Sequence, residues 1–370
     1  MTHPRNRRSL LISLGTIAIA LGATYAPVFG SQQRVIVVSG TELQEPLEQL
    51  EDRFEQAHPS IQLDLQFRGS QDIINDYIDD QAEVDPAILI PANGELLDEL
   101  SDRWQVQYDS DPFYEPPRPI VKTMLVGIAW SERGEVLFPT GEFDWSRLQT
   151  ALEANSWSDI GGSANWGSFD FVITDPTRSN SGQLTLSLWA QAKLGGDRLS
   201  SSKLNTSNLQ SLIGLIKRSV YLPPPSTDIL LQEFIARGPN EADIATVYES
   251  IALYRWQQSA ATQGQPYQIY YLDPTLETVS TAAIVRRNIS PQTADAAQQF
   301  LDFLTADPQQ AVFIRYGFRP GDASIDLQSV PESPWNQNIP GAEIDPAIRV
   351  ASTPDRQTLS ELIRLWQRAK

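Results

Sequence analysis

The chain has 370 residues, with 28 Lys and Arg against 46 Asp and Glu, a formal net charge of −18, and no Cys. The lack of Cys excludes disulfides, thiol chemistry and lipid attachment at a signal-peptide cysteine. The acidic excess excludes nucleic-acid binding through phosphates, because such binding requires clustered Lys and Arg. A chain of this length exceeds one ordinary core and indicates two lobes.

The first 30 residues have the pattern of an export signal. Three arginines precede an apolar run over residues 10–26, and residues 28–30 fit the small-residue rule for cleavage before Ser31. We therefore expect residues 1–30 to be a signal peptide and the mature chain to lie in the periplasm. The apolar run is long for a signal peptide and slightly short for a membrane span, so an uncleaved membrane anchor stays open as an alternative. The choice between Sec and twin-arginine export also stays open.

Strands and helices alternate in the chain that follows. Apolar or alternating residues predict strands over 35–38, 61–67 and 87–90, and apolar residues at helical spacing predict helices over 43–57 and 73–78. This βαβαβ order is typical of an α/β protein with a parallel sheet flanked by helices. Later strands are predicted over residues 121–129, 169–174, 243–248, 267–272 and 281–285, and later helices over 184–192, 209–216, 228–236, 296–304 and 359–366.

One segment combines a strand with a cluster of polar donors. The strand leads into Thr177, Ser179, Asn180 and Ser181, and a helix is predicted to begin at the last of these. Backbone N–H groups at a helix start have no intrahelical partner and carry the positive end of the helix dipole. Such a turn suits an anion, a carboxylate or another polar small molecule. A helix cap needs only one such residue, so this crowding favours a ligand site over capping alone.

The sequence carries no enzyme signature that we can support. Outside the expected signal peptide His58 is the only His, which leaves no Ser-His-Asp triad and no His-based metal site. Ser200-Ser201-Ser202-Lys203 matches the S-x-x-K pattern of penicillin-binding enzymes, but no K-T-G accompanies it. Phosphate-binding loops, dinucleotide fingerprints and nucleophile elbows are also missing from the sequence. We therefore expect a protein that is not an enzyme and that needs no metal or cofactor.

Five short segments lie in order along the chain, at residues 38–41, 68–70, 174–182, 242–248 and 296–320. In that order they resemble the type 2 periplasmic solute-binding proteins, in particular the molybdate- and phosphate-binding branches. The first two segments stand where the ligand loops of the first lobe would be, and the third where the loop and helix start of the second lobe would be. The fourth resembles a strand that ends in a ligand-facing tyrosine, and the fifth the closing helix pair and its Gly-Phe turn.

The resemblance implies two α/β lobes, each a mixed, mostly parallel sheet flanked by helices, joined by two crossover strands. The first lobe would comprise residues 31–125 and 280–370, and the second residues 126–279. The helix over 359–366 would pack on the first lobe. The ligand would lie in the cleft between the lobes, held by Thr41, Arg68, Gly69, Ser70, Thr177, Arg178, Ser179, Asn180, Ser181 and Tyr248.

The implied function is capture of a small ligand by a monomer and its delivery to the permease of an ABC transporter. An oxyanion of the phosphate, molybdate or sulfate class is the first expectation, with Arg68 or Arg178 supplying a counter-charge. An organic solute is the first alternative, and Trp145, Trp157 and Trp166 could either stack on it or lie in the core of the second lobe. A membrane-anchored sensor or assembly module that binds ligand without feeding transport is the second alternative.

We expect the exported protein to begin near Ser31, because the charged, apolar and small-residue regions of a cleaved signal follow one another before it. N-terminal sequencing of the protein from the periplasmic fraction measures this. Recovery of residues 1–30 intact in a membrane fraction would establish the anchor instead.

Overall fold

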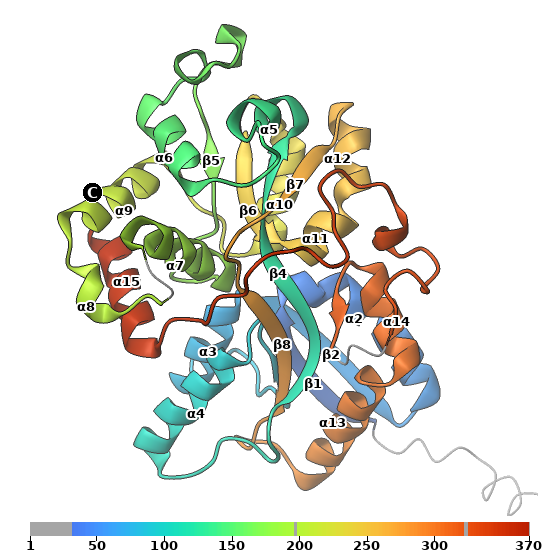
Figure 1. The fold of residues 1–370 in the computed structure, drawn as a ribbon. Helices are drawn as coiled ribbons and strands as arrows, with labels where there is room; N and C mark the ends of the chain where they lie inside the picture. Colours follow the sequence, from blue (N-terminus) through green and yellow to red (C-terminus); the bar gives the residue numbers. More distant parts are fainter. Residues whose placement is uncertain (1–31, 196–197, 322–324, 370) are drawn as a thin grey trace, which may run out of the picture.

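The computed structural model describes residues 32–195, 198–321 and 325–369, so the signal peptide expected over residues 1–30 lies outside the described residues. Two α/β lobes are joined by two strands (Figure 1), which confirms the expected fold class, although the sheet of the second lobe is mainly antiparallel rather than mostly parallel. The described strands form one nine-stranded sheet with the order β2-β1-β3-β8-β4-β6-β5, and β7 and β9 pair with β4 off this path. Every helix within these ranges is too short or too polar to cross a membrane.

The first lobe is built on three parallel strands, as the βαβαβ order predicts. β1 (Gln33–Gly40) lies between β2 (Ile61–Arg68) and β3 (Ile88–Ile90) and pairs with both in parallel. Two apolar clusters, one on each face of the sheet, bury the helices against these strands. These helices are η1 (Thr41–Leu43), α2 (Gln44–Ala57), α3 (Ser70–Ile78), α4 (Glu95–Tyr108), α13 (Pro291–Leu304) and α14 (Asp307–Arg315).

The long strand β4 (Arg118–Trp130) belongs to both lobes. Its first half pairs antiparallel with β8 (Glu277–Ile284) and, at Val121 and Lys122, with β9 (Arg319–Pro320). From Leu125 onward it pairs instead with β6 (Ile244–Tyr248) and β7 (Tyr267–Tyr271). β4 and β8 are therefore the two crossover strands that the resemblance implies.

The second lobe packs its helices around the continuation of this sheet. Trp130 stacks on Phe234 with ring centroids 4.9 Å apart, and Trp145 and Trp157 are buried in the same core. Two of the three tryptophans considered as a ligand platform are therefore core residues. The elements are α5 (Ser131–Leu137), α6 (Trp145–Ala154), η2 (Trp157–Ile160), η3 (Ala164–Trp166), β5 (Phe171–Val172), α7 (Asn180–Leu194), α8 (Ser201–Leu204), α9 (Ser207–Ser219), α10 (Thr227–Arg237), α11 (Glu249–Tyr254) and α12 (Trp256–Gln263).

The C-terminal segment does not pack on the first lobe, so that expectation is wrong. After β9 the chain crosses to the second lobe, where η4 (Pro334–Asn336) contacts α11 (Figure 1). It ends in α15 (Arg356–Arg368), which packs against α7, α8 and α9. Leu362 and Trp366 of α15 are buried in the core of the second lobe. An amphipathic helix needs a partner for its apolar face, and the second lobe supplies it.

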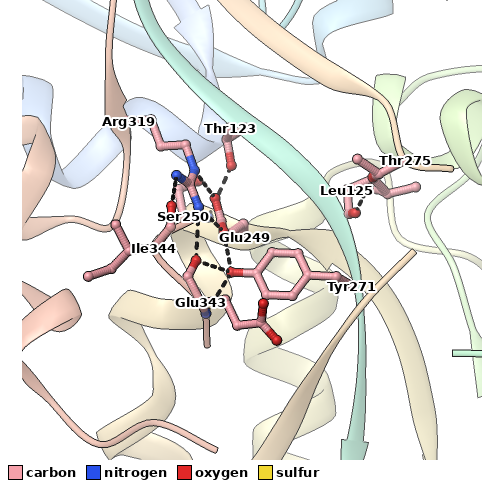
Figure 2. Close-up of polar contacts among 9 residues, drawn as sticks. All are labelled: Thr123, Leu125, Glu249, Ser250, Tyr271, Thr275, Arg319, Glu343 and Ile344. Carbon is pink, nitrogen blue, oxygen red and sulfur yellow. Dashed lines mark hydrogen bonds and ion pairs between the residues drawn. The ribbon is translucent and has the colours of Figure 1, made fainter. Parts of the chain in front are cut away.

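A buried ion pair ties both lobes and the C-terminal segment together beside the crossover strands (Figure 2). The Arg319 guanidinium donates to the two carboxylate oxygens of Glu249, each at 2.9 Å, and Glu249 is 0% exposed. Arg319 also donates to the carbonyls of Glu343 (3.1 Å) and Ile344 (2.6 Å). The Tyr271 hydroxyl donates to Glu249 at 2.6 Å. The buried carboxylate is thus satisfied by donors from two different strands.

We expect Glu249→Ala to lower the free energy of unfolding by about 3–5 kcal/mol, because it leaves a largely buried guanidinium without its counter-ion. Urea denaturation measures this change. The control is Glu233→Ala, whose ion pair with Arg237 is exposed within one helix and whose loss costs less than about 1 kcal/mol. Equal effects of the two substitutions would show that the buried pair contributes no more than the exposed one.

Candidate functional site

The loops that follow β2 and β5 meet across the interface between the lobes. The Gln71 N–H donates to the Arg178 carbonyl at 3.3 Å, and Gln183 Nε2 donates to Gln71 Oε1 at 3.1 Å. A Cβ atom on Gly69 would come within 2.6 Å of the Arg178 carbonyl oxygen and 2.8 Å of the Pro225 carbonyl oxygen. The lobes are therefore in direct contact, and the lack of a side chain at residue 69 permits this approach.

The serines at the start of α7 are buried among other hydroxyl groups. Ser181 Oγ lies 2.9 Å from Thr174 Oγ1, 2.6 Å from Thr227 Oγ1 and 3.3 Å from Ser179 Oγ. Thr227 is the first residue of α10, so this cluster joins the starts of two helices. Because these hydroxyls bond to one another, they hold the wall of the cleft in place and have little hydrogen-bonding capacity left for a ligand.

Asn180 and Tyr248 form a second polar group in the same wall. Asn180 Nδ2 donates to Tyr248 Oη at 3.0 Å, and both residues are buried. Burial raises the pKa of the Tyr248 phenol well above its ordinary value, so the group is neutral. Tyr248 accepts from Asn180, so this bond does not use its own hydroxyl hydrogen, but the side chain is only 1% exposed.

The hydroxyl groups of the predicted ligand loops differ in whether they already have a hydrogen-bond partner. Ser70 Oγ accepts from the Ala92 N–H at 2.9 Å within the first lobe. Thr177 Oγ1 donates to Asp175 at 2.8 Å within the second lobe. Thr41 Oγ1, by contrast, is buried and has no hydrogen-bond partner in the structure. Of these predicted site residues, Thr41 therefore has the hydroxyl group with the most hydrogen-bonding capacity left for a ligand.

The two arginines expected to supply a counter-charge are both paired with carboxylates. Arg68 binds Asp76 at 2.9 Å and lies 3.8 Å from Glu83. Arg178 binds Asp72 at 2.8 Å, and half of its side chain is exposed. In this structure neither guanidinium offers a free positive charge to the cleft.

Sequence reasoning missed Glu42, which follows the first predicted loop directly. Its side chain is 7% exposed, and its Oε1 atom has no hydrogen-bond partner. Burial raises the pKa of Glu42 to about 7, and the nearby Asp228 carboxylate adds to this rise. Sequence reasoning also missed Ser226 and Asp228 at the start of α10, although a Ser-Thr-Asp run after three prolines is a recognisable helix start.

The contacts between the lobes divide the cleft into two cavities. The larger has a volume of about 570 Å³, lies between α3 and α4 on one side and α7 and α15 on the other, and is lined mainly by polar side chains. The smaller has a volume of about 150 Å³ and lies between η1 and α2 on one side and α10 and α11 on the other. The larger is lined by Gln71, Asn75, Asn93, Glu95, Leu96, Asp98, Glu99, Asp102, Thr177, Asn180, Gln183, Leu184, Thr353, Pro354, Asp355, Arg356, Leu359, Ser360, Ile363, Arg364 and Gln367.

The arrangement suits reversible binding. The predicted loops lie at the carboxyl ends of strands, where open α/β sheets bind ligands, and they come from both lobes. Among the residues described, no three His, Asp or Glu side chains are grouped so that they could hold a metal ion. Two α/β lobes joined by two crossover strands, with polar loops of both lobes at a shared cleft, are the architecture of the type 2 periplasmic binding proteins.

The chain belongs to the family of bacterial extracellular solute-binding proteins, whose sequence profile matches residues 35–319. Its fold is similar to that of a periplasmic thiamin binding protein (TM-score 0.62, 15% identity, covering 91% of this chain and 96% of that one). It is also similar to that of the sulfate-binding protein SubI from Mycobacterium tuberculosis H37Rv (TM-score 0.57, 16% identity, covering 81% of this chain and 92% of that one). Iron-bound HitA from Pseudomonas aeruginosa is a third similar structure (TM-score 0.56, 16% identity, covering 90% of this chain and 98% of that one). The sequence matches no curated protein.

These comparisons identify the fold and the class of protein but do not identify the ligand. At such low identities each similarity concerns the fold alone, and the three similar proteins are named for chemically different ligands. The family and its structural neighbours are binding proteins, which agrees with the expectation of a protein that is not an enzyme.

We expect Gly69→Ala to shift the ligand-free protein toward an open form, because the new Cβ meets two backbone carbonyls of the opposite lobe. The dihedral angles of Gly69 (φ −61°, ψ 137°) are ordinary for alanine, so the first lobe itself should fold unchanged. Small-angle X-ray scattering should give a larger radius of gyration than for the wild type, at an unchanged melting temperature. Gly69→Val should give at least the same shift. A radius equal to that of the wild type in both variants would contradict close contact at this point.

Proposed function

We propose that this protein captures a small polar organic solute in the cleft between its lobes, outside the cytoplasmic membrane, and delivers it to the permease of an ABC transporter. The observation that carries the proposal is that polar side chains of both lobes, such as Gln71 and Gln183, line one cavity and touch across it. A ligand that bonds to both lobes stabilises the closed form, because only that form presents both sets of partners. A monomer suffices for this mechanism.

The size of the larger cavity favours an organic solute over an oxyanion. Ligand pockets for organic molecules have volumes of about 300–1,000 Å³, and about 570 Å³ falls within that range. A tetrahedral oxyanion would leave most of this space to water. The larger cavity is also lined by carboxamide groups, which both donate and accept hydrogen bonds and therefore suit a polar molecule with several functional groups. These groups belong to Gln71, Asn93, Asn180 and Gln183.

The charge of the cleft points the same way. The lining of the larger cavity holds five carboxylates against two guanidinium groups, Arg356 and Arg364, so it disfavours an oxyanion. Arg68 and Arg178 are both engaged by carboxylates, and the carboxylate of Glu42 is buried at the cleft. An oxyanion of the phosphate, molybdate or sulfate class is therefore the less favoured ligand. The thiamin-binding protein with a similar fold is a precedent for an organic ligand in this architecture.

A thermal-shift screen tests the proposal. Thiamin, amino acids, sugars, polyamines and organic acids form one arm, and sulfate, phosphate and molybdate form the other. A solute present at 100 times its Kd stabilises the folded protein by about 2.7 kcal/mol, which gives a clear rise in melting temperature. We expect a binder in the organic arm that also reduces the radius of gyration measured by small-angle scattering. Stabilisation by an oxyanion alone would reverse the assignment of ligand class, and no stabilisation in either arm would argue against solute capture.

A further inference from the structure

The smaller cavity of the cleft carries a marked excess of negative charge. Four carboxylates line it, and Arg255 is the single cationic side chain in its lining. The Arg255 guanidinium is already shared between Glu45 (2.8 Å) and Asp228 (2.7 Å). It therefore does not neutralise Glu42. The lining residues are Thr41, Glu42, Gln44, Glu45, Pro46, Glu48, Asp228, Gln232, Ile251, Tyr254, Arg255 and Tyr316.

Among these four carboxylates, Glu42 is the one whose surroundings most favour a bound cation. Its carboxylate is more than nine-tenths buried, borders the cavity, and leaves Oε1 without a hydrogen-bond partner. An isolated buried carboxylate is costly, and a cation placed beside it removes much of that cost. Glu45 Oε2 is also buried without a partner, so acceptors for more than one N–H group face the same space.

Two aromatic rings complete the lining. Tyr254 of α11 and Tyr316 of the first lobe lie with ring centroids 4.6 Å apart and planes tilted by 47°. The faces of such rings attract alkylammonium groups. The volume of about 150 Å³ equals roughly five water molecules, which suits an ammonium group with a short alkyl chain.

We propose that the smaller cavity binds the ammonium group of a cationic solute, with the Glu42 carboxylate as its counter-ion and Tyr254 and Tyr316 against its alkyl part. The proposal rests on the proposed function for solute capture in the cleft. It names the substrate class, an organic amine or quaternary ammonium compound, and places its ammonium group in the smaller cavity rather than in the larger one. An organic cation fits better than a metal ion, since the described residues place no three metal-ligating side chains together. Four carboxylates oppose an anion at the same place.

The protonation of Glu42 makes this binding depend on pH. With its pKa raised to about 7, the carboxyl group is mostly neutral at pH 6 and mostly charged at pH 8. A cationic solute prefers the charged form, so its affinity should rise about tenfold from pH 6 to pH 8. The titratable and charged groups that face Glu42 across the cavity and in the adjoining wall are Glu45 and Glu48 of α2, Asp228 of α10, Tyr248 of β6, Tyr254 and Arg255 of α11 and Tyr316 beyond α14.

Calorimetric titration of the full-length mature chain with choline and with putrescine tests the proposal. We expect at least one of these probes to bind the wild type, more tightly at pH 8 than at pH 6. Glu42→Gln keeps the shape of the side chain but removes its charge, so binding should weaken about ten- to a hundredfold and lose its pH dependence. The matched control is Asp52→Asn, which removes one exposed carboxylate from α2, away from both cavities, and should bind as the wild type does.

The outcomes separate this proposal from the proposed function. If neither probe binds, or if Glu42→Gln binds them with wild-type affinity, the ammonium site is wrong. If a neutral or anionic solute from the thermal-shift screen closes the cleft instead, solute capture stands and only the cationic class falls. The melting temperature of Glu42→Gln shows that the variant is folded, and removing a buried unpaired charge should leave it unchanged or raise it at pH 8.

Discussion

The arrangement of the whole molecule depends on the pairing of one strand, β4, with different partners along its length. Up to Met124 its ladder belongs to β8 and the first lobe, and from Leu125 it belongs to β6 and β7 of the second. Thr123 accepts from the Ser250 N–H, and Thr275 donates to the Leu125 carbonyl, so side chains brace the strand on both sides of this change (Figure 2). A rotation of the lobes about this line would carry the loops after β2 and β5 toward or away from each other.

Charge pairing explains why the cleft is acidic although its helix starts could hold an anion. The chain has many more carboxylates than cationic side chains, so a guanidinium group seldom lacks an acidic neighbour. Arg68 and Arg178 find theirs on α3, which begins within the cleft itself. The starts of α7 and α10 meanwhile bond to each other through hydroxyl groups. Glu42 is a buried carboxylate in this wall with no hydrogen-bond partner for its Oε1 atom, and such a charge would favour entry of a cationic solute over an anionic one.

Local pattern was enough to predict the strands of the first lobe, their parallel order and the loops that reach the cleft, because period and strand direction are properties of short segments. The contacts of those loops were not predictable in this way. Whether Arg178 faces a ligand or Asp72 depends on how two lobes meet, and Glu42 looks like any acidic residue of a short turn until the opposite lobe covers it. The same reason explains the error on the last helix. The spacing of Leu362 and Trp366 shows that one face must be buried, but several surfaces could bury it.

The course of the C-terminal segment places the two ends of the described chain on different lobes. β1 opens in the first lobe, whereas α15 is anchored on α7, α8 and α9 of the second (Figure 1). The start of α15 nevertheless reaches back to the first lobe, where Arg356 lies 3.4 Å from Asp102 of α4. Fluorescent proteins fused at the two ends would therefore move with different lobes. The efficiency of energy transfer between them would report lobe rotation directly, so this scaffold has the geometry of a genetically encoded sensor without internal insertion of a reporter.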